Sequence, residues 1–340
     1  MIKQPVGVIG SGSFGLAIAN LLSENVDVLM YARREEIRRR IERREGRYES
    51  LTANITAVSN LEHVAKECTL IFPIVPSKAF RSMMQSLGKH LKPYHMLIHG
   101  TKGLDLSLCP KDKLLSPKYI KTMSQVIEME SVVCRVGCLS GPNLSVEIME
   151  GQPAATLIAS RYNEVIRAGQ GALRSHRFQV YGTNDILGAE LAGALKNVIA
   201  LASGILGGKG LGKNIWALLI TRGLSEMVHI SKAMGSSVKS FLGVAGIGDL
   251  VATAASNKSR NYTVGYRLAK GETLEKILND MSEVAEGIRT LDTVKTLVNH
   301  FNISAPITEV IHRVFRRGMD IDRAIHFLMT YPYAVDVDFL

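Results

Sequence analysis

One lysine in an apolar stretch is the first residue of this sequence whose setting suggests chemistry. Lys196 lies in the middle of AELAGALKNVIALAS, residues 189–203, which has the composition of a helix of small and apolar residues. On a helix, residues three and four positions apart share a face. Small neighbours there would leave room above an ammonium group, and desolvation lowers the pKa of a lysine toward neutrality. A solvated lysine on an amphipathic helix fits this stretch as well. The neighbours on its face are Ala192, Gly193, Ile199 and Ala200.

Three further positions carry polar or charged side chains that could act on a substrate. Lys102 stands in HGTKGL, directly after the apolar run Met96–His99. Asp249 ends the segment GVAGIGD, and the triplet SRN, residues 259–261, places a guanidinium between two polar side chains. Such a triplet can bind a phosphate through the arginine fork and neighbouring N–H groups, although a polar loop with a surface arginine is the alternative interpretation.

A glycine-rich motif near the start of the chain indicates a dinucleotide site. The apolar run Val6–Ile9 is followed at once by GSGSFG, residues 10–15, and then by a helical pattern. In the order strand, motif and helix, Gly10 permits the tight turn, Gly12 lets the backbone approach a pyrophosphate, and Gly15 lets the helix pack against the strand. The first N–H groups and the dipole of the helix then face the phosphates. A glycine-rich turn that binds nothing is the alternative.

The residues after the second expected strand favour one cofactor over the other. An acid at the end of Val26–Tyr31 would bond the ribose hydroxyl of NAD, but this chain has Arg33 and Arg34 there. Arginine suits a 2′-phosphate by its charge and its planar donor fork. We therefore expect NADP(H) to be preferred, with NAD(H) as the second cofactor. Alternatively, both arginines only begin a charged helix, and Glu35 folds back to the ribose.

The order of apolar segments indicates which elements position these residues. Short strand-like runs alternate with helical patterns up to about residue 183, which predicts an α/β domain with a doubly wound Rossmann-type sheet. From residue 184 onward only helical patterns follow, so we predict a dinucleotide-binding domain over 1–183 and an all-α substrate-binding and catalytic domain over 184–340. The expected strands are Val6–Ile9, Val26–Tyr31, Thr69–Val75, Met96–His99, Val132–Leu139, Ala155–Ser160 and Phe178–Tyr181.

The composition argues against membrane proteins, nucleic-acid-binding proteins and metalloproteins. The 340 residues are 46% hydrophobic, enough for packed cores, but no unbroken apolar run is long enough to span a bilayer, so we expect a soluble cytoplasmic protein without stable membrane insertion. The net charge of +10 favours anionic partners, yet the arginines of 33–47 alternate with acids as on a solvated helix, which argues against nucleic acid. The four cysteines and nine histidines show no ligand spacing, so we expect no metal, and Cys134 and Cys138 are expected to be buried free thiols.

Taken in order, the motifs resemble those of bacterial-type NAD(P)-dependent glycerol-3-phosphate dehydrogenases over nearly the whole chain. The similar segments are GSGSFG, HGTKGL, SGPNLSVE, GALKNVIALASG, TRGLSEM, GIGDLVAT, SRN, VAEG and APITE. The resemblance implies a 6-phosphogluconate-dehydrogenase-like architecture and the reversible reduction of dihydroxyacetone phosphate to sn-glycerol 3-phosphate for glycerophospholipid biosynthesis. A homodimer is also implied.

The resemblance also implies residue roles. Lys196 matches the proton acceptor, and Lys102 and Asp249 are expected to assist it. Asn143 stands where the family usually has threonine or serine. Positions matching cofactor contacts are Ser13, Phe14, Arg33, Arg34, Lys102, Ser145, Arg260, Val284 and Glu286, together with the motif glycines Gly10, Gly12 and Gly15. Positions matching substrate contacts are Lys102, Gly141, Asn143, Lys196, Asp249, Ser259, Arg260 and Asn261.

These residues lead to a chemical hypothesis. The nicotinamide would supply a hydride, and Lys196 as an ammonium would donate the proton to the ketone oxygen. Lys102 would act as a cationic neighbour and polarise the oxygen, and Asp249 would orient the ammonium. A β-hydroxy acid dehydrogenase of the same architecture remains the alternative enzyme, and a nucleotide-sensing protein without turnover is an alternative of another class.

Overall fold

The chain forms two compact units in the computed structural model. The structure describes residues 4–110, 113, 115–281, 285–332 and 335. The first unit comprises residues 1–105 and 121–186, and the second comprises 106–120 and 187–340. The division near the helical part therefore lies three residues beyond the expected one. Residues 106–120 join the second unit because their 3-10 turn η3, Pro117–Tyr119, packs against helix α13, Glu286–His300.

The first unit is built on one sheet of eight strands in the order β3-β2-β1-β4-β5-β6-β7-β8. All neighbouring pairs are parallel except β6 and β7, which run antiparallel. This topology confirms the predicted doubly wound α/β sheet and adds one edge strand, β3, that the sequence did not indicate. The strands are β1 Val6–Ile9, β2 Val28–Tyr31, β3 Ile55–Val58, β4 Leu70–Pro73, β5 Met96–His99, β6 Arg135–Ser140, β7 Ala154–Ser160 and β8 Phe178–Thr183.

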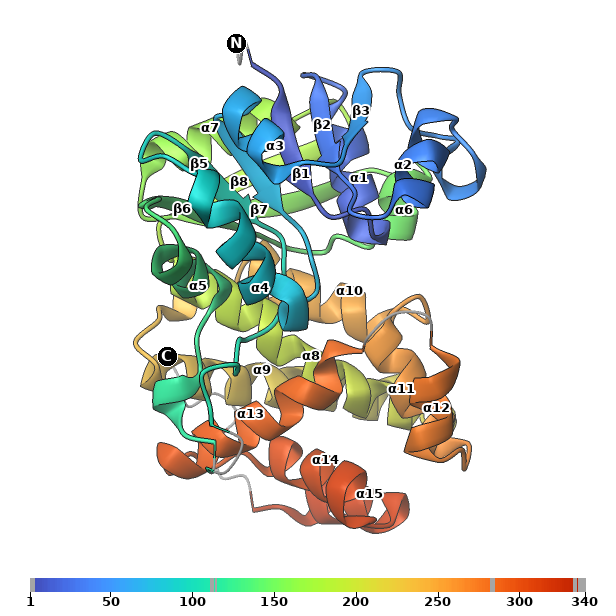
Figure 1. Cartoon of the computed structure of the whole chain (residues 1–340). Helices are drawn as coiled ribbons and strands as arrows, with labels where there is room; N and C mark the ends of the chain where they lie inside the picture. Colours follow the sequence, from blue (N-terminus) through green and yellow to red (C-terminus); the bar gives the residue numbers. More distant parts are fainter. Residues whose placement is uncertain (1–3, 111–112, 114, 282–284, 333–334, 336–340) are drawn as a thin grey trace. The chain divides into compact units, whose positions relative to one another are not determined.

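Helices cover the sheet in two groups, as Figure 1 shows. Helix α4 packs against both α3 and α5, whereas α1 packs against α6 and α7. Strands β1 and β4 are buried along their whole length, as expected of strands with a helical layer on each face. The helices are α1 Ser13–Leu22, α2 Glu35–Glu42, α3 Leu61–Glu67, α4 Ser77–Leu87, α5 Met123–Glu130, α6 Ser145–Met149 and α7 Asn163–Leu173, with short 3-10 turns η1 Gly46–Tyr48 and η2 Gly88–His90.

Of the two cysteines that we expected to be buried, only one is buried. Cys138 is buried in β6, but Cys134 is exposed because the strand begins one residue later, at Arg135. Both thiols are free.

The second unit is helical around α8, Ile186–Gly208, which carries Lys196. By length and composition this helix could cross a membrane, although Glu190 and Lys196 interrupt its apolar run, and 94% of its apolar window is buried, as in the core helix of a soluble protein. The other elements are α9 Lys213–Ala233, η4 Val238–Ser240, the π-helical turn η5 Val244–Gly248, α10 Asp249–Ala255, α11 Arg260–Ala269, α12 Leu274–Asp280, α13, α14 Pro306–Arg317 and α15 Ile321–Thr330.

Glycines let α8 and α11 approach closely. A Cβ atom on Gly204 would lie 2.0 Å from the carbonyl oxygen of Tyr262, and one on Gly265 would lie 2.0 Å from that of Leu201. Since no larger residue fits at either crossing, the glycines place the N-terminal end of α11, with its SRN triplet, beside the core helix.

Candidate active site

The first strand–helix turn has the geometry that the glycine motif predicted. Gly10 adopts φ +128°, and a Cβ there would lie 2.0 Å from the carbonyl oxygen of Ile74. A Cβ on Gly15 would lie 2.0 Å from the carbonyl oxygen of Gly10, so this glycine is required for the close packing of α1 on the turn. In contrast, a Cβ on Gly12 would meet no atom within 4 Å. The turn therefore leaves open space at Gly12.

The amino end of α1 faces that space without a competing side chain. Gly12 is the N-cap residue, and no side chain caps the helix. The positive end of the α1 dipole therefore lies at the open space beside Gly12, which fits the pyrophosphate of a dinucleotide. Ser13 and Phe14 are the first two residues of α1 and are half-buried. A Cβ at Gly100, after β5, would lie 2.9 Å from the Phe14 ring, so the ring packs against the HGTKGL segment.

Two exposed arginines follow the neighbouring strand. Strand β2 pairs with β1 so that Tyr31 lies opposite Ile9, and Arg33 and Arg34 leave the sheet beside the glycine turn. The Glu35 carboxylate accepts a hydrogen bond from Arg39 at 2.5 Å, one helical turn away, so its carboxylate is engaged on the helix surface. This arrangement favours the arginines over Glu35 as ribose-side groups.

The loops after β5 and β6 bring Lys102 and Gly141 together. The Lys102 ammonium donates a hydrogen bond of 2.8 Å to the carbonyl oxygen of Gly141, which adopts φ +146°. Two residues on, the Asn143 amide donates to the hydroxyl of Thr156 on β7 at 2.9 Å. Ser145 is the first residue of α6. Neighbouring parallel strands end at the same sheet edge, which explains why residues 39 positions apart meet.

Lys196 is a buried ion-pair residue rather than a solvated one. Its side chain is 6% exposed, and its Nζ lies 2.6 Å from Oδ1 of Asp249, itself 2% exposed. It also donates to the hydroxyl of Thr253, which in turn donates to the same Asp249 oxygen at 3.3 Å. Asp249 and Thr253 lie four residues apart on α10 and so present both groups on one face. The ammonium is held at a fixed position by a carboxylate and a hydroxyl.

A second buried network begins at the next residue. The Asn197 side chain accepts a hydrogen bond of 2.9 Å from the amide of Asn261, whose oxygen accepts one of 2.9 Å from the backbone N–H of Gly287. Helices α8, α11 and α13 are thereby joined, and Glu286 lies at the first position of α13, next to the bonded glycine. Val284 lies outside the residues that the structure describes.

The SRN triplet forms the start of α11. Ser259 is the N-cap residue, and its hydroxyl accepts a hydrogen bond from the N–H of Tyr262 at 3.4 Å. Arg260 is the first helical residue and is exposed, whereas Ser259 and Asn261 are buried. A helix amino end with an exposed guanidinium suits a phosphate group.

The expected site residues thus fall into two groups. Ser13, Phe14, Arg33, Arg34, Lys102, Gly141, Asn143 and Ser145 belong to the first unit, and Lys196, Asp249, Ser259, Arg260, Asn261 and Glu286 belong to the second. Within each unit the sequence motifs converge. Lys102 and Lys196 belong to different units, and the idea that Lys102 is a cationic neighbour of Lys196 stays a prediction.

The sequence interpretation missed two residues of the second unit, Asn197 and Thr253. Asn197 follows Lys196 directly, and Thr253 lies one helical turn after Asp249, so spacing alone offered a signal for both. Neither could be distinguished from an ordinary polar core residue before the partners of Lys196 and Asn261 were known.

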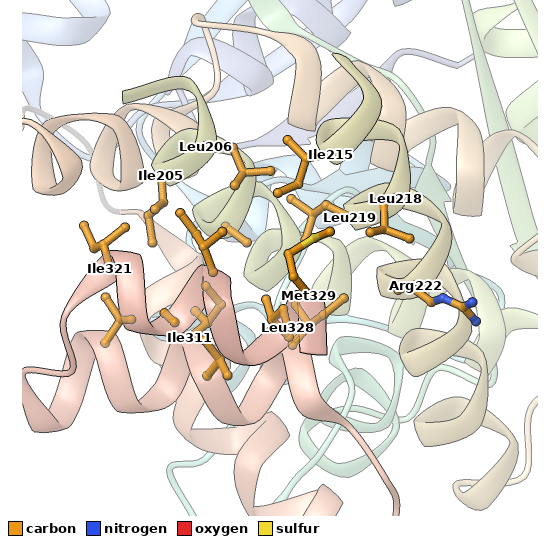
Figure 2. A pocket seen from close by; sticks show the side chains of 16 residues that line it. Ile205, Leu206, Ile215, Leu218, Leu219, Arg222, Ile311, Ile321, Leu328 and Met329 are labelled. Carbon is orange, nitrogen blue, oxygen red and sulfur yellow. The ribbon is translucent and has the colours of Figure 1, made fainter. Parts of the chain in front are cut away.

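An apolar pocket in the second unit does not contain these residues (Figure 2). It encloses about 60 Å³ among α8, α9, α14 and α15, and Arg222 is the one charged residue in its lining. Aliphatic side chains offer no proton donor or acceptor, so we place the chemistry at Lys196. The labelled lining residues include Ile205, Leu206, Ile215, Leu219, Ile311, Leu328 and Met329.

Comparison with known proteins agrees with this geometry. A family model described as the N-terminus of NAD-dependent glycerol-3-phosphate dehydrogenase matches residues 5–166, and the C-terminus model matches 185–326. The chain is 39% identical over 344 residues to a glycerol-3-phosphate dehydrogenase [NAD(P)+] of Pseudomonas putida, covering 99% of this chain and 97% of the relative. A relative with the same name from Azotobacter vinelandii is 38% identical, with 99% and 98% covered.

Solved structures show the same fold. The crystal structure of glycerol-3-phosphate dehydrogenase from Coxiella burnetii matches with a TM-score of 0.87 and 28% identity, covering 96% of this chain and 99% of that one. A ketopantoate reductase from Ralstonia eutropha matches with a TM-score of 0.56 and 14% identity, covering 95% and 100%, a likeness of fold alone. The chain belongs to the NAD-dependent glycerol-3-phosphate dehydrogenase family.

Proposed function

We infer that this chain is an NAD(P)-dependent glycerol-3-phosphate dehydrogenase, which reversibly reduces dihydroxyacetone phosphate to sn-glycerol 3-phosphate. The observation that carries this conclusion is the buried group of Lys196, Asp249 and Thr253 in the part of the chain matched by the family's C-terminal model. A β-hydroxy acid dehydrogenase is not favoured by the relatives.

Lys196 is proposed to move the proton. When bound, the nicotinamide cofactor supplies or accepts the hydride. The Lys196 ammonium donates a proton to the ketone oxygen during reduction and takes it back from the hydroxyl during oxidation. Burial keeps water from the Nζ, so the proton exchanges with the substrate oxygen.

Asp249 and Thr253 are proposed to orient the ammonium. Two of its three N–H donors point at Asp249 and Thr253 at fixed positions. These two bonds hold Nζ at a defined position, from which the ammonium is proposed to deliver its proton to a bound ketone oxygen. Prior positioning of a donor lowers the entropic cost of reaching the transition state.

Arg260 and the amino end of α11 are proposed to bind the substrate phosphate. A guanidinium can form a paired set of hydrogen bonds with phosphate, and the hydroxyl proton of Ser259 is a further donor. Lys102, Gly141 and Asn143, from the other unit, are proposed to contact the remainder of the three-carbon substrate, with Lys102 polarising the ketone.

NADP(H) is the proposed preferred cofactor. This proposal is supported by the exposed Arg33 and Arg34 directly after β2, whose charge suits a 2′-phosphate, and by the hydrogen bond between Glu35 and Arg39. Glycerophospholipid biosynthesis is the proposed use of the product. A cytoplasmic location and a homodimer are proposed from the family resemblance.

The direct test measures oxidation of NADPH and of NADH by the purified protein with dihydroxyacetone phosphate. We expect turnover with both cofactors and a higher kcat/KM with NADPH. Short β-keto acids serve as the comparison substrates. Turnover of β-keto acids without turnover of dihydroxyacetone phosphate would contradict the proposed activity, and equal or better kcat/KM with NADH would contradict the cofactor preference alone.

A further inference from the structure

The segment after β2 contains eight arginines, and the structure separates them by their partners. Four of them are engaged locally: Arg38 donates to the carbonyl oxygens of residues 32 and 33, Arg39 pairs with Glu35, Arg43 lies 3.8 Å from Glu45, and Arg44 donates to backbone carbonyls of residues 41, 52 and 55. Arg33 and Arg34 were assigned above. This leaves Arg40 and Arg47, which have no role in the proposed function.

Arg47 contacts the glycine turn itself. Its Nη2 group donates a hydrogen bond of 3.1 Å to the carbonyl oxygen of Ser11, the residue between Gly10 and Gly12. The same Nη2 donates to the hydroxyl of Tyr48 at 2.9 Å. Both Nη2 protons are thus used, while Nη1 and Nε have no acceptor among the residues that the structure describes. A guanidinium is held at the dinucleotide turn with three N–H donors available.

The local backbone conformation positions the Arg47 side chain. Gly46 adopts φ +61°, which lets the chain reverse after α2 and return as the turn η1 toward the glycine motif. The Tyr48 side chain is fully buried, and the Arg47 guanidinium lies 5.1 Å from the centre of its ring, close enough for a cation–π contact. Arg40 lies 5.7 Å from the same ring. The buried ring acts as a fixed support, so Arg47 is positioned although its side chain lies at the surface.

The position of Arg47 relative to the strands identifies the anion. Ser11 lies two residues beyond Ile9 and Arg33 two residues beyond Tyr31, and these strand ends are paired. In a dinucleotide fold, the adenosine ribose lies between the first glycine turn and the end of the second strand. A guanidinium bonded to Ser11 is therefore held next to the region where the ribose would bind, at the strand end paired with the one that Arg33 and Arg34 follow.

We propose that Arg47 is a specificity-determining residue that binds the 2′-phosphate of NADP(H). The proposal rests on the proposed NADP(H) preference and adds a residue to it. A dianionic phosphate gains a second set of charge-assisted hydrogen bonds there, whereas the 2′-hydroxyl of NAD(H) offers no charge to Arg47. Arg47 should therefore distinguish the two cofactors.

The test compares two nucleotide probes on the full-length protein. The affinities of 2′,5′-ADP, which carries the 2′-phosphate, and of 5′-AMP, which lacks it, are measured by calorimetry for the wild type, Arg47→Gln, Arg47→Lys and Arg43→Gln. Arg43→Gln is the matched control, because it removes the same charge from the same segment without contact to the glycine turn. Melting temperatures verify that each variant is folded.

We expect Arg47→Gln to lower the affinity for 2′,5′-ADP about tenfold or more, because charge-assisted hydrogen bonds are lost. The affinity for 5′-AMP should change by less than about twofold. Arg47→Lys should recover part of the lost affinity. Arg43→Gln should change the affinity only slightly, because salt screens the influence of an exposed charge that does not contact the ligand. The kcat/KM for NADPH should fall in parallel, with that for NADH preserved.

Equal weakening of both probes would overturn the proposal, because it would show that Arg47 only supports the turn. Unchanged binding of both probes, or the same loss in Arg43→Gln, would overturn it too. These outcomes are separate from the enzymatic activity, since wild-type turnover of dihydroxyacetone phosphate is measured independently of the probes.

Discussion

The two units differ in the groups that form their candidate sites. In the first unit, glycine turns, a helix amino end and exposed arginines form the proposed nucleotide site, which depends mainly on backbone geometry. In the second unit, buried side chains from α8, α10 and α11 hold one another, and partners such as Lys196 and Asp249 are 53 residues apart. The first arrangement is suited to a ligand that is mostly phosphate and sugar, and the second to a single proton transfer that needs a fixed donor.

The largest expected effect comes from removing the centre of the buried network. Lys196→Met should lower kcat by about 10²- to 10⁴-fold, the usual contribution of a general acid or base, with a smaller change in KM. Steady-state kinetics with dihydroxyacetone phosphate measure this. The substitution also leaves the Asp249 carboxylate buried without its ion-pair partner, which typically costs about 3–5 kcal/mol of stability.

The double variant Lys196→Met/Asp249→Asn separates the two effects. It should regain much of the lost stability, measured by denaturant unfolding, but none of the activity. Near-native turnover in the folded single variant would remove Lys196 from the proposed role and break the contrast between the units.

A second prediction concerns a buried carboxyl group of the helical unit. Glu226 on α9 accepts hydrogen bonds from the N–H groups of Ile307 and Thr308 at the start of α14, yet burial dominates and raises its pKa from 4.5 to about 7. The folded state therefore binds more protons than the unfolded state between about pH 4.5 and 7. Stability from this group is present below pH 4.5 and is lost as the pH rises through 7, by up to about 3 kcal/mol.

Glu226→Gln keeps an acceptor for α14 and cannot ionise, so we expect its unfolding free energy to vary less across this range than that of the wild type. Urea unfolding at pH 5, 6, 7 and 8 measures the difference. The exposed Glu275→Gln serves as the control. Parallel pH profiles for Glu226→Gln and wild type would show that the ionisation of Glu226 does not affect folding.

The smallest expected effect comes from a substitution in the glycine turn of the first unit, at Gly12. Because a Cβ on Gly12 meets no protein atom, Gly12→Ala should leave the melting temperature nearly unchanged. The new methyl group would occupy space in front of the α1 amino end, so the KM for NADPH should rise about tenfold, equivalent to roughly 1.4 kcal/mol of lost binding. Gly15→Ala is the contrasting variant, since its Cβ would lie 2.0 Å from the Gly10 carbonyl oxygen and destabilise the fold itself. If Gly12→Ala bound NADPH normally, the pyrophosphate would not approach this glycine.

The sequence by itself determined the backbone turn on which the proposed nucleotide site is built. The strand–glycine–helix order fixed the turn at Gly10, Gly12 and Gly15, and the residues after β2 indicated the ribose side, because local geometry follows from local spacing. Short apolar runs also located most strands, and their disappearance marked the change to helices near residue 184. It did not indicate β3, an edge strand with one fully buried residue, or the assignment of residues 106–120 to the helical unit.

Only the tertiary structure decided what surrounds Lys196 and which of the arginines after β2 reaches the glycine turn. The lysine stretch by itself fitted an exposed side chain as well as a buried one, and Thr253 and Asn197 looked like ordinary core residues. Arg43 and Arg47 are alike in type and neighbourhood, yet one lies beside Glu45 and the other bonds to Ser11. The physical reason is that hydrogen-bond partners are chosen over a few ångströms in space: Arg47 and Ser11 lie 36 residues apart along the chain, and Asn261 and Asn197 lie 64 apart.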